Sequence, residues 1–237
     1  MYSTKVTIIG AGKYGSAMAY TVQEDSSRQV TFVARNPDVV SEINNERRSS
    51  RIGDDSVRWN SNVKATTSVE EGLKDCDIVF LAIPAQTIPA KLTEMRPLLE
   101  KKTLIVNCAK GMVLAQEKFL CEIIAAEYPD LLDRYCFLSG PSFASEVFKK
   151  YPTQVVVACS IDTNAFKVMD AVASPFFKSY WQDDVIGCEL AGALKNVLAL
   201  GAGYIEGMGL GYNTMSCWVT RGVKEAKICS KSFGANP

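Results

Sequence analysis

The first patterned stretch of the chain is a short apolar run that leads into a cluster of glycines. Residues 5–9 have the apolar, β-branched composition of a buried strand, and Gly10-Ala-Gly-Lys-Tyr-Gly15 follows at once. Residues 16–22 then have helical character. A strand, a tight glycine turn and a helix in this order predict the first strand–helix unit of a parallel sheet.

The remaining apolar runs predict strands that alternate with helices. The run Asp77–Ile83 is apolar at nearly every position, which is typical of a strand buried on both faces of a parallel sheet. We expect a polar helix and an exposed loop over 38–61, and Ser68 as the cap of a helix over 69–73. Further helices are predicted near 87–98 and 116–127, and further strands at 29–34, 62–67, 103–108, 135–138, 154–158 and 176–181. The fold class is therefore α/β, a Rossmann-type, doubly wound and mostly parallel sheet.

The strand pattern stops near residue 184. Residues 188–200 are predicted to form one long helix, and a glycine-rich loop at 207–211 leads to a second helix over about 213–233. We therefore expect two domains: a Rossmann-type domain at 1–186 and a helical domain that begins at 187.

Charge and composition exclude several classes of function. Lys plus Arg and Asp plus Glu number 26 each, so no basic field favours nucleic acid. The apolar runs have the length of strands, and no charged segment precedes an apolar one at the N-terminus. We expect a cytoplasmic protein with no membrane span.

The cysteines and the missing histidine restrict the chemistry. The eight cysteines are too widely spaced for a CxxC metal motif, so we expect free thiols in a reducing compartment and no metal site. The chain has no histidine. Acid–base chemistry must therefore use Lys, Asp, Glu, Tyr or Cys.

The glycine spacing G-x-G-x-x-G predicts a dinucleotide site. The first glycine allows the tight turn, the second lets the backbone approach a pyrophosphate, and the third lets helix and strand pack closely. The helix that begins there directs N–H groups and a partial positive charge at the phosphates. The alternative is an ordinary strand-to-helix turn without a ligand.

Arg35 follows the second predicted strand, where this class of fold selects its cofactor. An acidic side chain there would bind the ribose 2′-hydroxyl of NAD, whereas an arginine accommodates the 2′-phosphate of NADP. Arg35 favours NADP(H), although an arginine can also stack on adenine, and a solvated surface arginine is the simpler alternative. Distinctive residues also follow other predicted strands, at Pro84, Lys110 and Gly140 with Ser142. Because ligands bind beyond the carboxyl ends of parallel strands, we expect these residues to share one site.

Five motifs together resemble the bacterial-type NAD(P)-dependent glycerol-3-phosphate dehydrogenases, and the resemblance runs from end to end. They are Gly10-Ala-Gly-Lys-Tyr-Gly15, Asn107-Cys-Ala-Lys-Gly-Met112, Ser139-Gly-Pro-Ser-Phe-Ala144, Glu189-Leu-Ala-Gly-Ala-Leu-Lys-Asn-Val197 and Asn213 with Thr220-Arg-Gly222. The resemblance implies reversible reduction of dihydroxyacetone phosphate to sn-glycerol 3-phosphate by NAD(P)H, in glycerophospholipid synthesis. Family analogy alone suggests a homodimer.

The resemblance also implies roles for matching residues. Lys195 would be the general acid–base, Lys110 would bind substrate beside the nicotinamide, and Asn196 would orient the lysine and the substrate. Gly140 and Ser142 would contact the substrate. Burial and a second cation nearby can lower a lysine pKa towards neutrality, which suits a lysine base. The expected cofactor contacts are Gly10, Gly12, Lys13, Tyr14, Gly15, Arg35, Pro84, Lys110 and Ala144.

The chain departs from this family in its length. Family members continue with further helices, including an arginine that grips the substrate phosphate, and Arg221 is not at that position. The resemblance therefore implies an NAD(P)-binding Rossmann domain at 1–186 and the start of an incomplete all-helical substrate or catalytic domain at 187–237. We expect that a chain of this length can be inactive. The alternatives are a dinucleotide-binding fragment without catalysis, and another dehydrogenase with a Rossmann and a helical domain, of the ketopantoate or hydroxyacid type.

Overall fold

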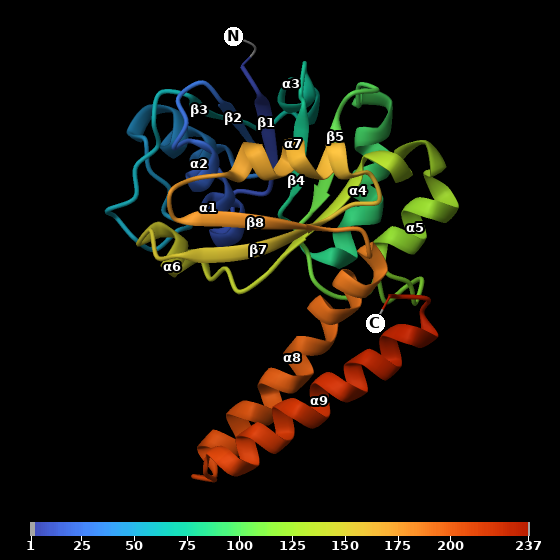
Figure 1. The fold of residues 1–237 in the computed structure, drawn as a ribbon. Coiled ribbons are helices and arrows are strands. Elements are labelled where there is room, and N and C mark those ends of the chain that lie inside the picture. The colour runs from blue at the N-terminus through green and yellow to red at the C-terminus, as the bar shows by residue number, and fades with distance from the viewer. Residues whose placement is uncertain (1–2, 237) are drawn as a thin grey trace.

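The computed structural model describes residues 3–236, and its centre is one eight-stranded sheet (Figure 1). The predicted domain limits at residues 1 and 237 lie outside the described residues. The strand order is β3-β2-β1-β4-β5-β6-β7-β8. The strands are β1 (Lys5–Ile9), β2 (Gln29–Val33), β3 (Val63–Thr66), β4 (Ile78–Leu81), β5 (Leu104–Asn107), β6 (Tyr135–Ser139), β7 (Thr153–Ala158) and β8 (Phe177–Gln182).

Strands β1 to β6 are all parallel, which confirms the predicted doubly wound sheet. Strand β7 runs antiparallel to β6, and β8 is parallel to β7. The carboxyl ends of β1, β2, β4, β5 and β6 therefore meet at one edge of the sheet. The loops that leave these strands hold the residues selected from the sequence.

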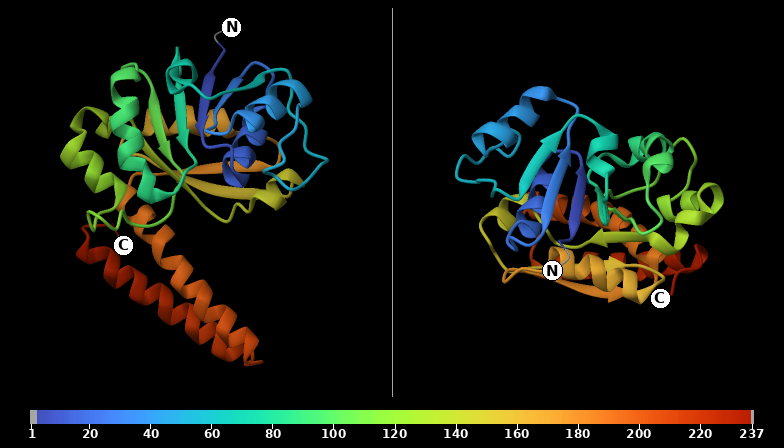
Figure 2. Two further views of the ribbon diagram at one scale, coloured as in Figure 1. Left: turned by 180° about the vertical axis from the view of Figure 1, so that it is seen from behind. Right: turned by 90° about the horizontal axis from the view of Figure 1, so that it is seen from above.

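Helices cover both faces of the sheet (Figures 1 and 2). The α-helices of this part are α1 (Lys13–Val22), α2 (Pro37–Ser41), α3 (Val69–Leu73), α4 (Ile88–Met95), α5 (Leu120–Glu127), α6 (Ala144–Phe148) and α7 (Asp162–Val172). Short 3-10 segments are η2 (Ala85–Thr87), η3 (Arg96–Leu98) and η4 (Pro129–Arg134), and η1 (Glu42–Glu46) is a π-helical turn. The serine cap of α3 is confirmed, because the Ser68 hydroxyl accepts a hydrogen bond from the N–H of Glu71 (3.1 Å).

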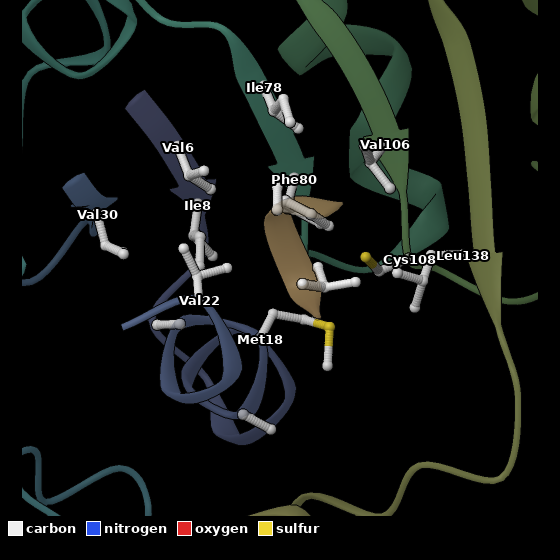
Figure 3. Packing of buried hydrophobic residues seen from close by; sticks show 14 of the residues in the cluster. Val6, Ile8, Met18, Val22, Val30, Ile78, Phe80, Val106, Cys108 and Leu138 are labelled. Carbon is white, nitrogen blue, oxygen red and sulfur yellow. The ribbon is translucent and has the colours of Figure 1, made fainter. Parts of the chain in front are cut away.

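Strand β4 shows why this sequence needs two helical layers. Ile78 and Phe80 belong to the apolar core under α1 and α7, whereas Val79 and Leu81 belong to the core on the opposite face, under α4 and α5. Since successive side chains of a strand point to opposite faces, an unbroken apolar run must be covered on both sides. Met18 and Val22 of α1 extend into the first of these cores, beside Ile8 and Phe80 (Figure 3).

The exposed loop predicted within 38–61 is wrong in part. Ile52, Val57 and Trp59 are buried in the core next to β2, and the Trp59 ring packs edge-on against Phe32 with centroids 5.3 Å apart. The segment is mostly polar and has no regular hydrophobic period, so burial of these three side chains could not be predicted from the sequence. It covers the end of the sheet core rather than lying free in solvent.

A helical hairpin projects from the edge of the sheet that holds the strand-end loops. Helix α8 (Val185–Gly207) continues past the predicted end at residue 200, and α9 (Tyr212–Ser232) returns alongside it (Figures 1 and 2). A Cβ placed on Gly201 would lie 2.0 Å from the Trp218 ring, and one on Gly222 would lie 2.2 Å from Leu198. Each glycine thus accepts a large side chain of the other helix, which lets α8 continue through glycines that usually weaken a helix.

The Asp184 carboxylate fixes both ends of the hairpin to the sheet. One oxygen caps α8 by accepting the N–H of Gly187 (2.9 Å), and the other accepts the N–H of Asn236 beyond α9 (2.9 Å). Phe233 packs edge-on against Phe119 of the sheet domain with ring centroids 5.7 Å apart.

Helix α8 is the one helix within residues 3–236 whose length and apolar composition would suffice to cross a membrane. Core helices of soluble proteins meet the same criterion. The helix also carries Glu189 in its second turn and Lys195 close to its middle, and charged side chains are costly inside a bilayer. Its apolar composition is therefore weak evidence for a membrane span.

The packing of Trp59 predicts a large loss of stability on truncation. We expect Trp59→Ala to lower the free energy of unfolding by about 3–5 kcal/mol, because it leaves a cavity against Phe32. Urea unfolding followed by circular dichroism measures the loss. Leu114→Ala is the control at a side chain that is 73% exposed, and it should change stability by less than about 0.5 kcal/mol. Equal small losses in both variants would show that the 38–61 segment does not anchor the core.

Candidate active site

The glycine loop has the geometry that a pyrophosphate requires. Gly10 has φ +106°, and a Cβ there would lie 2.6 Å from the carbonyl oxygen of Ala82 at the end of β4. A Cβ on Gly15 would lie 2.1 Å from the carbonyl oxygen of Gly10. Apart from the adjoining backbone, no atom of residues 3–236 lies within 4 Å of the Cβ position of Gly12, so the space beside it is open.

Helix α1 begins directly at this open space. Gly12 is its extended N-cap residue and provides no side chain to accept a hydrogen bond from the first turn. The N–H groups at the beginning of a helix have no partner within the helix, and together with the helix dipole they bind phosphate. The residues of this loop therefore fit the pyrophosphate of a dinucleotide.

Tyr14 joins the glycine loop to the loop that follows β6. Its hydroxyl lies 3.1 Å from the Ser142 hydroxyl, and Ser142 is buried. Burial raises the pKa of Tyr14 well above its usual value, the nearby Cys108 thiol adds to the rise, and the hydrogen bond to Ser142 opposes it. A cofactor contact and a substrate contact expected from the resemblance are thus direct neighbours.

Gly140 has a structural reason to be glycine in addition to its expected role. A Cβ at this position would lie 2.7 Å from the carbonyl oxygen of Gln154 and 2.8 Å from the Cα of Val155, both on β7. The chain leaves β6 so close to β7 that no larger residue fits. Ala144 is half-buried against the main core at the first turn of α6.

Three of the expected cofactor contacts are exposed at the strand ends. Lys13, Arg35 and Pro84 are solvent-exposed, and within residues 3–236 the side chains of Lys13 and Arg35 take part in no hydrogen bond or ion pair. Pro84 leads straight into η2, where its carbonyl oxygen accepts the Thr87 hydroxyl (2.8 Å). Lys13 and Arg35 therefore remain available to a ligand.

The two lysines selected from the sequence come together between the sheet and α8. Lys110 follows β5 and is half-buried, whereas Lys195 lies on α8 and is exposed. The pKa of Lys110 is lowered to about 8, first because burial disfavours its charge and then because Lys195 brings a second positive charge close to it. Asn196 follows Lys195 and is exposed. Arg221 lies elsewhere, paired with Glu225 on α9 (2.5 Å).

Cys108 connects the lysine pair to the glycine loop. Its thiol is buried, and burial raises its pKa to about 12, with Lys110 acting in the opposite direction. The same thiol influences Tyr14. Tyr14, Cys108 and Lys110 are therefore near neighbours, which places the lysines on the same side of the sheet edge as the open space beside Gly12.

One buried carboxyl in this region was not singled out as functional from the sequence. Glu189 is 3% exposed on α8 and bonds to the Tyr135 hydroxyl, to the Asn107 side chain (3.4 Å) and to the N–H of Cys121 (3.2 Å). Burial raises its pKa above the usual range, and these hydrogen bonds oppose the rise. No sequence pattern marks such a contact, because its partners lie on three different elements.

This fold and this site define a dinucleotide-dependent oxidoreductase. The chain belongs to the NAD-dependent glycerol-3-phosphate dehydrogenase family. The sequence model of the N-terminal part of that family matches residues 5–165, and the model of its C-terminal part matches residues 184–237. The glycerol-3-phosphate dehydrogenase (NAD(P)+) of Corynebacterium diphtheriae is 37% identical over 235 residues, a match covering 98% of this chain and 70% of that protein.

Solved structures agree with this assignment. The glycerol-3-phosphate dehydrogenase of Coxiella burnetii has a TM-score of 0.87 and 27% identity, and the match covers 100% of this chain and 71% of that one. A ketopantoate reductase from Ralstonia eutropha has a TM-score of 0.58 and 16% identity, over 82% of this chain and 62% of that one. The second likeness shows a shared fold alone, so the comparisons favour the first family over the ketopantoate type.

The contact between the lysines predicts how Lys110 titrates. In Lys195→Met we expect the pKa of Lys110 to rise from about 8 towards 10.5, since the second cation is removed while the burial stays. This pKa is obtained by labelling the protein with a trace amount of an amine-acylating reagent at a series of pH values. Peptide mass spectrometry then measures the extent of labelling of Lys110 at each pH. Lys91→Met, at a lysine paired with Glu94, is the control and should leave it unchanged.

The same shift has a consequence for stability with a fixed sign. Between pH 8 and pH 10.5 the unfolded chain holds the proton on Lys110 more firmly than the folded chain. The contribution of this residue to the free energy of unfolding therefore rises with pH through that window. An unchanged titration of Lys110 in Lys195→Met would show that the two ammonium groups do not interact.

Proposed function

We propose that this chain reduces dihydroxyacetone phosphate to sn-glycerol 3-phosphate with NAD(P)H, reversibly. Membership of the glycerol-3-phosphate dehydrogenase family supports this reaction. The observation that carries the proposal for the site is the approach of α8, which carries Lys195, to Lys110: a Cβ on Gly192 would lie 3.7 Å from Cγ of Lys110. The chain spans about 70% of the length of the Corynebacterium relative, so its own activity has to be measured.

The residues of the sheet edge would hold the cofactor. Gly10, Gly12 and Gly15 leave room for the pyrophosphate at the beginning of α1, and the remaining contacts would come from Lys13, Tyr14, Arg35, Pro84, Lys110 and Ala144. When bound, the nicotinamide supplies the hydride. The protein has to supply the accompanying proton and the correct position of the substrate.

Lys195 would supply that proton. In the direction of reduction its ammonium group gives a proton to the substrate oxygen as the carbonyl carbon receives the hydride, and in reverse the neutral amine takes the hydroxyl proton. Two ammonium groups in contact repel each other, so the pair releases one proton more easily than an isolated lysine. The pKa of Lys110 is lowered first by burial and then by the nearby charge of Lys195.

Lys110 would bind the substrate next to the nicotinamide, with Gly140 and Ser142 on the neighbouring strand end. A cation that contacts an oxygen on which negative charge develops stabilises the transition state more than the ground state. Asn196 would orient Lys195 and the substrate. The hydrogen bond between Tyr14 and Ser142 supports this arrangement, because it ties the substrate loop to the cofactor helix.

Turnover with the purified chain tests this proposal. We expect oxidation of NADH or NADPH only when dihydroxyacetone phosphate is added. The loss of absorbance of the reduced nicotinamide measures this oxidation. Ketopantoate and a 2-oxo acid are the competing substrates. Lys195→Met should abolish turnover, a loss of at least about 100-fold since general acid catalysis contributes on the order of 10²–10⁴. Cofactor binding, measured by nicotinamide fluorescence, should be unchanged.

Controls for this experiment separate the possible failures. Lys91→Met should retain turnover, because that lysine is engaged with Glu94 on α4. Full activity of Lys195→Met would contradict the assignment of the proton donor. Cofactor binding without turnover in the unaltered chain would contradict the proposed activity and support a dinucleotide-binding protein without catalysis.

Arg35 predicts the cofactor preference. We propose NADPH as the preferred cofactor, because the guanidinium group at the end of β2 can bind a 2′-phosphate. Arg35→Ala should raise KM for NADPH roughly tenfold or more, the equivalent of about 1.5–3 kcal/mol for a charge-assisted hydrogen bond, with little change for NADH. Steady-state kinetics with both cofactors measures the change, and Arg51→Ala is a matched control in the loop beyond η1. Equal effects on the two cofactors would indicate stacking on adenine instead.

We further propose the cytoplasm as the compartment, glycerophospholipid synthesis as the use of the product, and two domains divided near residues 184–188. The free cysteines fit a reducing compartment. A homodimer is proposed by analogy alone. Analytical ultracentrifugation of the purified chain measures its oligomeric state.

A further inference from the structure

The buried carboxyl of Glu189 fastens α8 to three elements of the sheet domain. Its Oε1 accepts hydrogen bonds from the Tyr135 hydroxyl on β6 and from Asn107 Nδ2 at the end of β5 (3.4 Å). Its Oε2 accepts the N–H of Cys121 at the beginning of α5 (3.2 Å). The ion pairs within residues 3–236 do not include Glu189. Its hold on the sheet therefore depends on neutral donors.

Asn107 carries this connection on to the loop that holds Lys110. The Asn107 side chain is buried, and its Oδ1 accepts the N–H of Ala109 (2.8 Å), the residue before Lys110. Its Nδ2 donates to the Tyr135 hydroxyl (3.0 Å) as well as to Glu189. Because both ends of the amide are engaged, the side chain cannot turn without breaking the network.

Helix α8 carries the connection on to Lys195. Glu189 and Gly192 are three residues apart and both are buried on the side of α8 that faces the sheet, whereas Lys195, three residues further on, borders that side and is exposed. A Cβ on Gly192 would lie 3.3 Å from the Phe137 ring and 3.7 Å from Cγ of Lys110. The helix therefore rests directly on the stem of Lys110, one turn beyond Glu189.

We propose that Glu189 and Asn107 are positioning residues, whose buried hydrogen-bond network fixes Lys110 and Lys195 relative to each other across the junction of sheet and helix. The consequence for catalysis rests on the proposed function. A buried carboxyl is a costly way to pack a helix, and the neighbouring Leu190 is fully buried and provides apolar contact. What the carboxyl adds is direction, because hydrogen bonds fix orientation and apolar contacts do not.

The titration of Lys110 tests the proposal without any need for turnover. The titratable groups that act on the Lys110 ammonium are Lys195 on α8 and Cys108 on its own loop, and Glu189 is not among them. In Glu189→Ala and in Asn107→Ala we expect the pKa of Lys110 to rise from about 8, as the two lysines separate. Loss of a negative charge through space would lower that pKa, so the sign of the shift distinguishes lost position from lost charge.

The controls use hydrogen bonds of matched kind. Asn44 bonds to the N–H and to the carbonyl of Ala65 (2.8 Å each), as Asn107 bonds within its own network, but on the far side of the sheet by β3. Asn44→Ala should reduce stability and leave the Lys110 titration unchanged. Glu189→Gln retains one acceptor oxygen, so the pKa of Lys110 should rise less in this variant than in Glu189→Ala. If Glu189→Ala does not fold, Tyr135→Phe replaces it in the test, because this variant removes one hydroxyl only. The pKa of Lys110 must rise in Tyr135→Phe as well.

Turnover provides the second measurement. With dihydroxyacetone phosphate we expect Glu189→Ala to lower kcat roughly 10- to 100-fold, since misplacement by about 1 Å can cost 10² in rate. KM for NADPH should stay within about twofold. A Lys110 pKa of about 8 in folded Glu189→Ala and Asn107→Ala would overturn the proposal. A shifted titration in a chain that shows no turnover would uphold it and count against the proposed function alone.

Discussion

The parallel direction of β1 to β6 is the constraint on which the rest of this molecule depends. It brings the loops after five strands to one edge of the sheet, although they are scattered between Gly10 and Ser142 in the chain. Parallel strands must be crossed over by helices, and those helices require apolar side chains on both faces of the sheet. The residues that bury the core and the residues that meet a ligand are consequences of the same topology, one within the strands and the other just beyond them.

The elements that the sequence predicted well are those in which local pattern and tertiary packing agree. Strand β1 begins and ends where its apolar run does, and Ser68 caps α3 as its position before acidic residues indicates. The prediction was wrong where packing overrode local pattern. The helix predicted over 188–200 continues to Gly207, because Gly201 accepts the ring of Trp218 from α9. Polar composition marked 38–61 as exposed, yet Trp59 is buried there against Phe32.

The site could be predicted in part for the same reason. The glycine loop is a local motif, so its turn and its open face could be anticipated from spacing alone. Lys110 could be selected because it follows a predicted strand, whereas Lys195 could be selected only by family resemblance, because nothing local to either lysine indicates that they meet. Glu189 resembles any acidic residue in a helix until the sheet is in place. Its significance depends on Asn107 and Tyr135, which come from two adjacent parallel strands and are brought beside α8 only by the completed fold.

Within residues 3–236 the hairpin meets the sheet domain near its base, at Asp184, Glu189 and Gly192 on one side and at Asn236 and Phe233 on the other. Within the hairpin, Gly201 and Gly222 lock the two helices together, so it should tilt as a single lever about that base. With a rise of about 1.5 Å per residue, Lys195 lies roughly 9 Å along α8 from Glu189, and Gly207 lies roughly 27 Å along it. A tilt that swings the far end by several ångströms therefore moves Lys195 by only about a third as much. Because Lys195 lies near the base of the hairpin, its position depends little on motion of the far end.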